Sequence, residues 1–391
     1  MVLETLELRN FRNYEAEEVV FHEKINILTG RNAQGKTSLV EAVGLLALGK
    51  SFRTRREQEM VRFGEAEARV RGVFEKKGRP HTTEVRLGTG LGKGLVPGGS
   101  PGLKGKKPYV VNGLETGTVA DLLGGVYTIV FSPEDLRVVK GDPETRRRFL
   151  DRELILQRPL YYHKLKKYRH ALKNRNALLK GEQVDAAVLD VYDDQFAEAA
   201  CEVMKERAAW VLGLSEAASA ASALITDGVE EISAEYKPSL AGTMGEKTNC
   251  LSKIDDKALK SAICDVLTRG RERDIQLRST EAGPHRDDFA VFAGGLDLRV
   301  YGSQGQQRTA ALSLRLAERE LIKKETGEDA ILLLDDVMSE LDRGRQDRLL
   351  ESFGDNQIFI TSAEHGLFGS GGRLAALRGA KVMKVEGGRI V

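Results

Sequence analysis

A glycine-containing segment near the N-terminus constrains this chain more than any other feature of its sequence. Residues 30–37 read Gly-Arg-Asn-Ala-Gln-Gly-Lys-Thr and fit the pattern G-x-x-x-x-G-K-[ST]. The segment follows an apolar run, residues 25–28, that predicts a short buried strand. It precedes a stretch from Lys36 onward whose apolar residues recur with helical spacing. A strand, a glycine loop and a helix in this order are typical of a phosphate-binding loop.

The chemistry of such a loop assigns a role to its residues. Backbone N–H groups at the start of the helix bind phosphate oxygens, and the glycines let the backbone approach closely. Lys36 is expected to reach the β- and γ-phosphates, and the Thr37 hydroxyl is expected to bind Mg²⁺. The alternative is a glycine turn with a surface lysine. The predicted nucleotide-binding residues of the loop are Gly30, Arg31, Asn32, Ala33, Gln34, Gly35, Lys36, Thr37 and Ser38.

A second apolar run, residues 331–334, ends in two carboxylates, Asp335 and Asp336. In an enzyme with a phosphate-binding loop, one aspartate at such a strand end holds Mg²⁺, and we assign this role to Asp335. Asp336 lies one residue further on and is suited to polarise the attacking water as a general base. The alternative is that Asp336 only caps the turn that follows it.

The composition excludes several classes of protein. The 391 residues are 41% hydrophobic and 30% charged, which excludes collagen, disulfide scaffolds and wholesale disorder and allows two or three domains. The 60 Lys and Arg residues nearly balance the 58 Asp and Glu residues, so any basic surface must be confined to part of the molecule. Three widely spaced cysteines, no apolar run of membrane-spanning length and no signal-peptide pattern predict a cytoplasmic protein with no membrane partner.

The pattern of elements predicts an α/β fold with a helical insertion. Residues 1–126 and 280–391 are expected to form one discontinuous head, and residues 127–279 a helical arm or lobe. Within the head, residues 88–117 hold ten glycines and are expected to form a flexible loop that ends in a hairpin. The alternation of apolar residues over 296–300 predicts a strand.

Helix signals support this insertion. Asp142 followed by Pro143 is typical of a helix start, and Pro159 is expected to begin a second helix. In that second helix, Tyr161, Leu165 and Tyr168 have the spacing of a coiled-coil seam.

Residues 303–306, Ser-Gln-Gly-Gln, resemble the signature motif of the ABC-type ATPase superfamily, and residues 339–342 resemble its D-loop. In such proteins the signature contacts the γ-phosphate bound to a second subunit, so that two heads enclose two ATP molecules. The resemblance therefore implies that Ser303, Gly305 and Gln306 complete an ATP site across a homodimer. The predicted catalytic residues are Lys36, Ser303, Asp335 and Asp336, and the predicted metal ligands are Thr37 and Asp335.

Further stretches along the chain resemble the RecF family of bacterial DNA replication and repair ATPases. They are residues 8–14, 32–34, 50–54, 131–136, 146–151, 283–288, 303–308 and 334–342. The resemblance implies an ABC-type, SMC-like head with an inserted helical domain that binds ATP and Mg²⁺. It implies an ATP-dependent homodimer on gapped DNA or single- to double-strand junctions, with slow, DNA-stimulated hydrolysis. It also implies work with RecO and RecR to load recombinase on single-stranded gaps, feeding the SOS response.

Three positions depart from the pattern of the wider superfamily. Residues 131–132, Phe-Ser, stand where a glutamine is usual, Asp336 where a glutamate is usual, and residues 361–362, Thr-Ser, where a switch histidine is usual. Each departure predicts slow hydrolysis. His285, beside two aspartates, is expected to sit hydrogen-bonded in a tight turn rather than to bind a metal.

Basic residues are concentrated in one part of the chain. Residues 140–180 hold 13 Lys or Arg and four Asp or Glu, whereas residues 181–202 hold seven acids and no Lys or Arg. This pattern predicts sequence-independent, salt-sensitive binding of DNA phosphates, or else a solvated helical face paired with an acidic helix. The candidate DNA-binding residues are Arg53, Arg55, Arg56, Lys164, Lys166 and Lys167.

Two other functions are compatible with the motifs: the ATPase subunit of a membrane transporter, and a structural chromosome-organising ATPase. Lys36 and Ser303 are 267 residues apart. This separation is longer than a transporter ATPase requires, and the insertion is shorter than the long coiled coils of chromosome-maintenance proteins.

Overall fold

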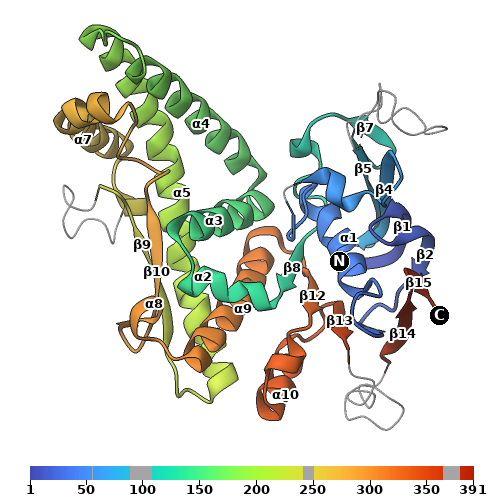
Figure 1. Cartoon of the computed structure of the whole chain (residues 1–391). Coiled ribbons are helices and arrows are strands. Elements are labelled where there is room, and N and C mark those ends of the chain that lie inside the picture. Colours follow the sequence, from blue (N-terminus) through green and yellow to red (C-terminus); the bar gives the residue numbers. More distant parts are fainter. Residues whose placement is uncertain (55, 89–107, 241–250, 364–378) are drawn as a thin grey trace. The chain divides into compact units, whose positions relative to one another are not determined.

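The structure is a computed structural model, and it divides into two compact units (Figure 1). Unit 1 comprises Met1–Pro133 and Ile322–Val391, and unit 2 comprises Glu134–Leu321. The structure describes the whole chain except residues 55, 89–107, 241–250 and 364–378. The mixed α/β class agrees with the sequence-based prediction, but residues 280–321 group with the helical unit rather than with the head. They do so because their apolar side chains, among them Phe289 and Leu314, are buried in the core of unit 2.

Unit 1 contains two six-stranded sheets. The first sheet is antiparallel, in the order β2-β1-β4-β5-β6-β7. Its strands are β1 (Val2–Phe11), β2 (Tyr14–Val20), β4 (Glu67–Lys76), β5 (Arg79–Gly88), β6 (Tyr109–Val111) and β7 (Leu114–Thr116). The predicted hairpin between β6 and β7 is confirmed, with Asn112 and Gly113 both at positive φ. Most of the predicted glycine-rich loop, residues 89–107, lies outside the described residues.

The second sheet of unit 1 carries the strands that lead to the site. Its order is β15-β14-β3-β13-β12-β8, and all neighbours run parallel except β14 and β15. The strands are β3 (Ile25–Thr29), β8 (Thr128–Phe131), β12 (Ile331–Asp335), β13 (Ile358–Ser362), β14 (Lys381–Glu386) and β15 (Arg389–Ile390). Because β3, β12 and β13 are parallel neighbours, their carboxyl ends meet at one edge, which is where such sheets place ligands.

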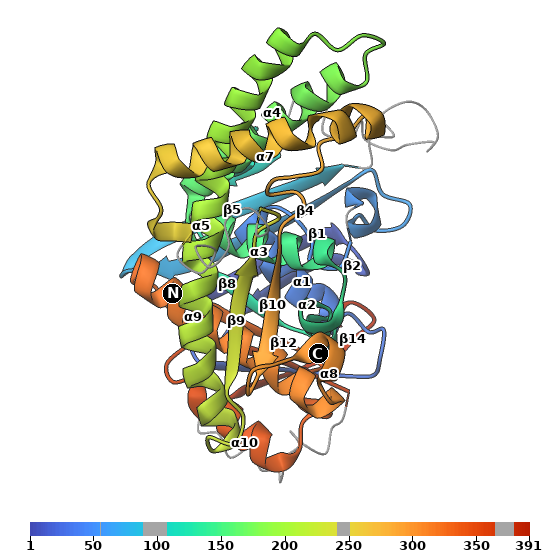
Figure 2. The same cartoon turned by 90° about the vertical axis from the view of Figure 1, so that its left-hand side faces the viewer.

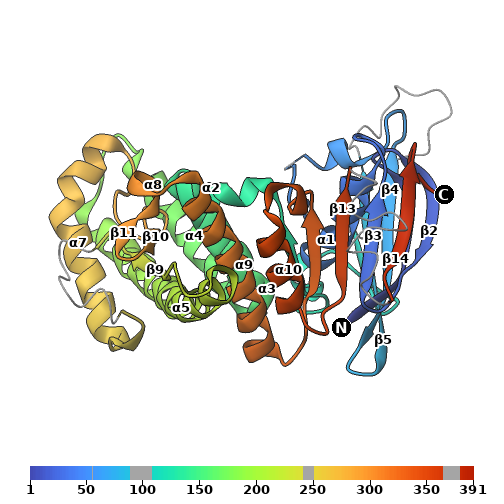
Figure 3. The same ribbon diagram turned by 90° about the horizontal axis from the view of Figure 1, so that it is seen from below.

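Helix α1 (Lys36–Leu48) packs against strands of both sheets, and Figure 3 shows it beside β13. Leu39, Val43 and Leu46 are fully buried, and most other residues of the helix are buried as well. A helix that is apolar on all sides is a core helix. Unit 1 also contains α10 (Arg343–Ser352), which Asp342 caps by accepting a hydrogen bond from the N–H of Arg345.

Unit 2 is mainly helical and contains a three-stranded sheet in the order β11-β10-β9. Figure 2 shows β9 and β10 side by side next to the long helix α5. Its helices are α2 (Leu136–Lys140), α3 (Pro143–Gln157), α4 (Pro159–Leu179), α5 (Ala186–Thr226), α7 (Asp256–Leu277), α8 (Leu298–Tyr301) and α9 (Gln304–Thr326), the last of which ends in unit 1. Its strands are β9 (Ile232–Lys237), β10 (Asp288–Ala293) and β11 (Leu296–Asp297).

The predicted helix starts in unit 2 are confirmed. Asp142 caps α3 by accepting a hydrogen bond from the N–H of Thr145, and Pro159 begins α4. The predicted strand over residues 296–300 is wrong beyond Asp297, because the Asp297 side chain caps the short helix α8. Strand β9 was not predicted at all.

The buried charges of unit 2 are paired. Arg207 donates to Asp151, and Arg175 donates to both Asp193 and Asp274. His285 donates from Nε2 to the carbonyl of Thr280, and its Nδ1 accepts from the hydroxyl of Tyr168. The predicted hydrogen-bonded turn at His285 is therefore confirmed, and the described residues contain no cluster of three His, Cys, Asp or Glu suited to a metal.

Helix α5 meets the length and hydropathy criteria for a membrane-spanning helix, although the sequence has no continuous apolar run of that length. An 18-residue window of α5 has a mean hydropathy of 1.4, and 39% of that window is buried within the structure. Phe196, Trp210 and Leu214 of this helix lie in the hydrophobic core of unit 2. We therefore assign α5 as a core helix.

Candidate nucleotide-binding site

The loop between β3 and α1 curls around the start of the helix. Gly30 and Gly35 have φ angles of 146° and 121°, a region that side chains avoid. A Cβ atom at Gly30 would lie 2.3 Å from the carbonyl oxygen of Val385, and one at Gly35 would lie 2.8 Å from the Asn13 amide nitrogen. The two glycines of the motif are therefore required by both conformation and space.

Neighbouring turns hold this loop in place. The side-chain amide of Asn13 donates to the carbonyl of Gln34 over 2.8 Å, and the Tyr14 hydroxyl donates to the carbonyl of Gly35 over 3.1 Å. From the other side, the N–H of Gly387 donates to the Gln34 side chain and the N–H of Gly388 to its carbonyl. Contacts within the protein, without a nucleotide, thus fix the shape of the loop. Gln34 takes part in three of them, through its carbonyl oxygen and its side chain.

Lys36 folds back over the loop. Its ammonium donates to the carbonyl of Gly30 over 2.6 Å and to the carbonyl of Arg31 over 2.9 Å. Burial lowers the pKa of Lys36, and the carboxylates of Asp336 and Asp335 oppose this shift. The ammonium is therefore held against the carbonyl oxygens of the loop at the start of α1, where a helix N-terminus favours a phosphate chain.

Asp335 and Thr37 form the link between the loop and the strand ends. The Thr37 hydroxyl donates to Oδ1 of Asp335 over 2.9 Å, and the Thr361 hydroxyl donates to the same oxygen over 3.0 Å. Burial raises the pKa of Asp335, while these two hydrogen bonds lower it. A hydroxyl and a carboxylate oxygen at this separation are the hard ligands that Mg²⁺ prefers, so these residues fit the ion.

Asp336 adopts a conformation that is unusual for a residue with a side chain. Its φ is 58°, and its N–H donates to the Thr361 hydroxyl over 2.9 Å. The Ser339 hydroxyl donates to the carbonyl of Asp336 over 2.8 Å and contacts its carboxylate. This strained conformation is held by its neighbours, as is common at functional sites.

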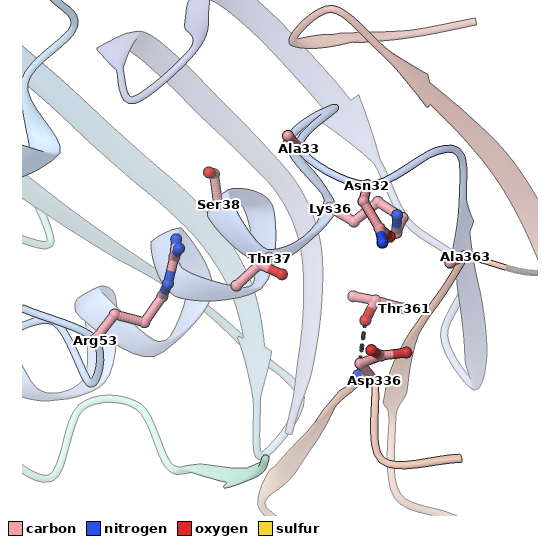
Figure 4. Close-up of a pocket in the computed structure, with 10 residues that line it drawn as sticks. Asn32, Ala33, Lys36, Thr37, Ser38, Arg53, Asp336, Thr361 and Ala363 are labelled. Atoms are coloured by element: carbon pink, nitrogen blue, oxygen red, sulfur yellow. Dashed lines mark hydrogen bonds between the residues drawn. The ribbon is translucent and has the colours of Figure 1, made fainter. Parts of the chain in front are cut away.

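Lys36, Thr37, Asp336 and Thr361 line one cavity of about 280 Å³ (Figure 4), whereas Asp335 lies behind Thr37 and Thr361, to which it is hydrogen-bonded, and is not among the lining residues. The cavity is lined by Asn32, Ala33, Gly35, Lys36, Thr37, Ser38, Arg53, Asp336, Thr361 and Ala363. Six of the nine predicted loop residues line it, whereas Gly30, Arg31 and Gln34 do not. Every lining residue belongs to unit 1. Thr361 was noted in the sequence only as a departure from the usual switch histidine, and neither Thr361 nor Ala363 was predicted to line the site.

Arg53 lies in this cavity, although the sequence placed it among the DNA-binding candidates. Its guanidinium donates to Glu41 over 3.1 Å, and Arg12 also donates to that carboxylate. Glu41 lies on α1 and is fully buried. Arg53 is thus held beside the nucleotide loop by a buried carboxylate, and its Ser51-Phe52-Arg53 context carried no signal for this.

The signature-like segment forms the start of α9 in unit 2. The N–H of Gln306 donates to the Ser303 hydroxyl over 3.2 Å, and the N–H of Ser303 donates to the Gln306 side chain over 3.0 Å. This reciprocal pair is a capping box. Ser303 and Gly305 are exposed, so the first turn of α9 faces solvent in the single chain. The loop and this turn belong to different units.

The remaining candidates for DNA contact differ in their environment. Lys164 pairs with Glu206, and Lys167 pairs with Glu198 and Glu202 over 2.7 and 3.0 Å. Lys166 is exposed and has no ion pair within the described part of the chain. The acidic helix therefore neutralises two of these three lysines. Arg56 pairs with Glu59 over 3.8 Å, and Arg55 lies outside the described residues.

The chain is similar to one family over nearly its whole length. Residues 2–384 match the family model "RecF/RecN/SMC N terminal domain". The chain is 39% identical over 364 residues to the DNA replication and repair protein RecF of Clostridioides difficile, covering 93% of this chain and 92% of that protein. It is 38% identical over 396 residues to the RecF of Bacillus subtilis, covering 100% of both.

Solved structures agree. A structure described as the recombination mediator protein RecF-ATP in the RecFOR pathway superposes with a TM-score of 0.86 at 32% identity, covering 100% of this chain and 97% of that one. An Smc head bound to the C-winged helix domain of ScpA has a TM-score of 0.52 at 15% identity, covering 100% of this chain and 98% of that one, which shows a shared fold alone.

Proposed function

The chain belongs to the RecF/RecN/SMC N terminal domain family, within its RecF members, and we propose that it is a DNA-repair ATPase that dimerises on ATP at gapped DNA. The observation that carries this proposal is the joining of Lys36, Thr37 and Asp335 at one strand edge, beside a cavity that phosphate and a metal ion fit. The site residues act as follows.

Lys36 and the backbone of the loop bind the phosphate chain. The ammonium is already aimed across the loop by two carbonyl oxygens, so little ordering is needed when ATP enters. The N–H groups at the start of α1 add the positive end of the helix dipole. Arg53, held by Glu41, contributes a second cation to the same cavity.

Thr37 and Asp335 hold Mg²⁺ through their oxygen atoms. The ion, when bound, neutralises phosphate charge that develops during transfer. The residues supply hard ligands and orientation, since Asp335 is held by hydroxyl donors on two sides. The supporting observation is the donor set itself, because both groups are oxygen ligands.

Asp336 takes the proton of the attacking water. Its carboxylate borders the cavity, and its backbone is held in one conformation by Thr361 and Ser339. The aspartate side chain is one methylene shorter than the glutamate usual in the superfamily, and Thr361 and Ser362 replace the usual histidine. Both features support slow hydrolysis, and the family supplies the further expectation that DNA stimulates it in a protein that works as a switch.

Ser303, Gly305 and Gln306 complete the ATP site of a second molecule. They lie at the start of a 23-residue helix, the side chains of Ser303 and Gln306 cap it, and Ser303 and Gly305 are exposed. A helix N-terminus of this kind binds anions. Two ATP molecules enclosed by two chains make dimerisation depend on nucleotide.

DNA binds one face of α4. On α4, His163, Lys166, His170 and Lys173 recur at intervals of three, four and three residues; Lys180, seven residues further on, directly follows the last residue of the helix, and all five are exposed. Within the described residues, none of the three lysines has a carboxylate partner. This face, rather than Lys164 and Lys167, is suited to phosphates, and its binding is sequence-independent. The family supplies the further expectation that RecO and RecR cooperate in loading recombinase.

Sedimentation velocity tests the proposal. The protein is measured with ATP and Mg²⁺, with ADP and Mg²⁺, and with each in the presence of gapped or fully duplex DNA. The proposal expects dimers with ATP, stabilised most by gapped DNA, and monomers with ADP. A protein that stays monomeric with ATP under both DNA conditions contradicts it.

A further inference from the structure

Thr361 contacts both aspartates of the site, Asp335 through its carboxylate and Asp336 through its backbone N–H. It is the fourth residue of β13, and its partner in the parallel register is Asp335 at the end of β12. Its side chain is 2% exposed, and it lines the nucleotide cavity together with Asp336 (Figure 4). It stands at the position where the chain departs from the usual switch histidine.

The hydroxyl of Thr361 is both a hydrogen-bond donor and a hydrogen-bond acceptor. It donates its one hydrogen to Oδ1 of Asp335 over 3.0 Å and accepts the N–H of Asp336 over 2.9 Å. A hydroxyl has a single donor and two acceptor sites. The hydroxyl hydrogen bonds to Asp335, and a lone pair of the same oxygen accepts from Asp336. One atom therefore holds both aspartates and restrains how they are oriented relative to each other.

The contact with Asp336 has a specific consequence. A residue with a side chain at φ 58° is disfavoured and persists only where surrounding contacts hold it. The Thr361 oxygen holds the backbone N–H of this residue. The conformation in turn sets where the Asp336 carboxylate leaves the backbone at the cavity.

The contact with Asp335 is not a duplicate of the one from Thr37. Both hydroxyls donate to Oδ1, but the Thr37 oxygen is also the proposed Mg²⁺ ligand. Thr361 has no such second role. It is therefore the donor that holds Asp335 independently of the metal.

We propose that Thr361 is a positioning residue for ATP hydrolysis. Its one hydroxyl orients Asp335, the proposed metal ligand, and Asp336, the proposed general base, relative to each other. The proposal rests on the proposed ATPase function. A purely structural role does not require a hydroxyl here, since valine has the same shape and suits a strand.

Three variants separate orientation from packing. Thr361→Val keeps the shape and removes the hydroxyl, Thr361→Ser keeps the hydroxyl and removes the methyl group, and Thr361→Ala removes both. For Thr361→Val we expect kcat to fall about ten- to hundred-fold, the range seen when a catalytic group loses its orienting hydrogen bond. We expect Thr361→Ser to retain kcat within about three-fold.

The readouts include two that do not depend on turnover. The dissociation constant of ATP is measured by titration calorimetry in EDTA and again in Mg²⁺, beside single-turnover hydrolysis and thermal melting. For Thr361→Val we expect affinity in EDTA within about two-fold of wild type, and at least about a five-fold rise in the Mg²⁺ concentration needed for half-maximal affinity. If the valine variant melts early, the comparison of alanine with serine decides instead.

Several outcomes overturn the inference. Turnover by Thr361→Val, or by Thr361→Ala, within two-fold of wild type contradicts a positioning role. A loss in the serine variant as large as that in the valine variant shows that the hydroxyl alone does not preserve turnover, which assigns the effect to packing and also contradicts it. These outcomes leave the proposed function standing if the wild-type protein binds and hydrolyses ATP. A wild-type protein that does not bind ATP overturns both.

Discussion

The Thr37 hydroxyl donates a hydrogen bond to Oδ1 of Asp335 across 298 positions of the sequence. The two residues meet because β3 and β12 are both parallel neighbours of β13, so the loop after β3 and the end of β12 reach the same sheet edge. The two proposed metal ligands are thus brought together by sheet topology before any ligand binds. The cost of ordering them is met by folding rather than by binding.

Lys36→Met is expected to weaken ATP binding by about 2–4 kcal/mol, or roughly 30- to 1,000-fold, because the variant keeps the length of the side chain and loses its charge. Equilibrium titration with a fluorescent ATP analogue measures the loss. Lys24→Met is the matched control, since Lys24 pairs with Asp355 on the surface of the same unit. An affinity for ATP that is unchanged in Lys36→Met removes the lysine from the site.

Asp336→Asn is expected to bind ATP normally and to hydrolyse it about 100-fold or more slowly, because an amide cannot take a proton from water. The ATP-bound dimer then accumulates, and its lifetime on gapped DNA is measured by size-exclusion chromatography or single-molecule dissociation. Asp355→Asn serves as a control, because Asp355 is exposed on the same unit and pairs with Lys24 at the surface. Equal turnover by Asp336→Asn and wild type is incompatible with a general base at this position.

The contribution of the exposed lysines Lys166, Lys173 and Lys180 to DNA binding is compared with that of Lys164 and Lys167, which are paired with acids. Lys166→Gln, Lys173→Gln and Lys180→Gln together are expected to reduce the slope of log K against log salt by about two to three, since each phosphate contact contributes about 0.9. The double variant Lys164→Gln, Lys167→Gln is the control, because acids on α5 already neutralise those lysines. Fluorescence anisotropy over a salt series measures both. A larger effect from the control assigns binding to the paired lysines.

Much of the fold and part of the site could be predicted from sequence. The glycine loop was predictable because its conformation demands glycine at Gly30 and Gly35, and the helix start at Asp142 because capping needs only neighbouring residues. Arg53 and Thr361 could not be placed, because each acts through partners that lie elsewhere in the sequence, Glu41 and the two aspartates.

The same reason explains the errors in unit 2. Charge counting along one helix cannot show that α5 supplies partners for Lys164 and Lys167, since that depends on how two helices pack. The alternation at residues 296–300 predicted a strand, and one capping aspartate, Asp297, was enough to turn it into a helix. Local patterns were reliable where local contacts decide the structure.

Acidification is expected to destabilise unit 2 through His285. Burial lowers the pKa of His285 below its usual value of about 6.5, and its ring nitrogens are both hydrogen-bonded in the folded state. Below about pH 6.5 the unfolded chain binds a proton that the folded chain does not, so the free energy of unfolding falls as the pH drops toward the lowered value. Well above pH 6.5, His285 is neutral in both the folded and the unfolded chain and adds nothing to the pH dependence of the free energy of unfolding.

The size of this effect is measured by urea unfolding between pH 7.5 and 5.0, followed by the fluorescence of Trp210, the one tryptophan in the chain. In His285→Gln the fall in unfolding free energy between pH 7 and 5.5 should be smaller than in wild type, with part of the slope remaining because burial also lowers the pKa of His81 in unit 1. His163→Gln is the matched control, since it removes an exposed histidine from α4 of the same unit. If His285→Gln and wild type lose the same free energy over this range, the buried imidazole is not the group that titrates.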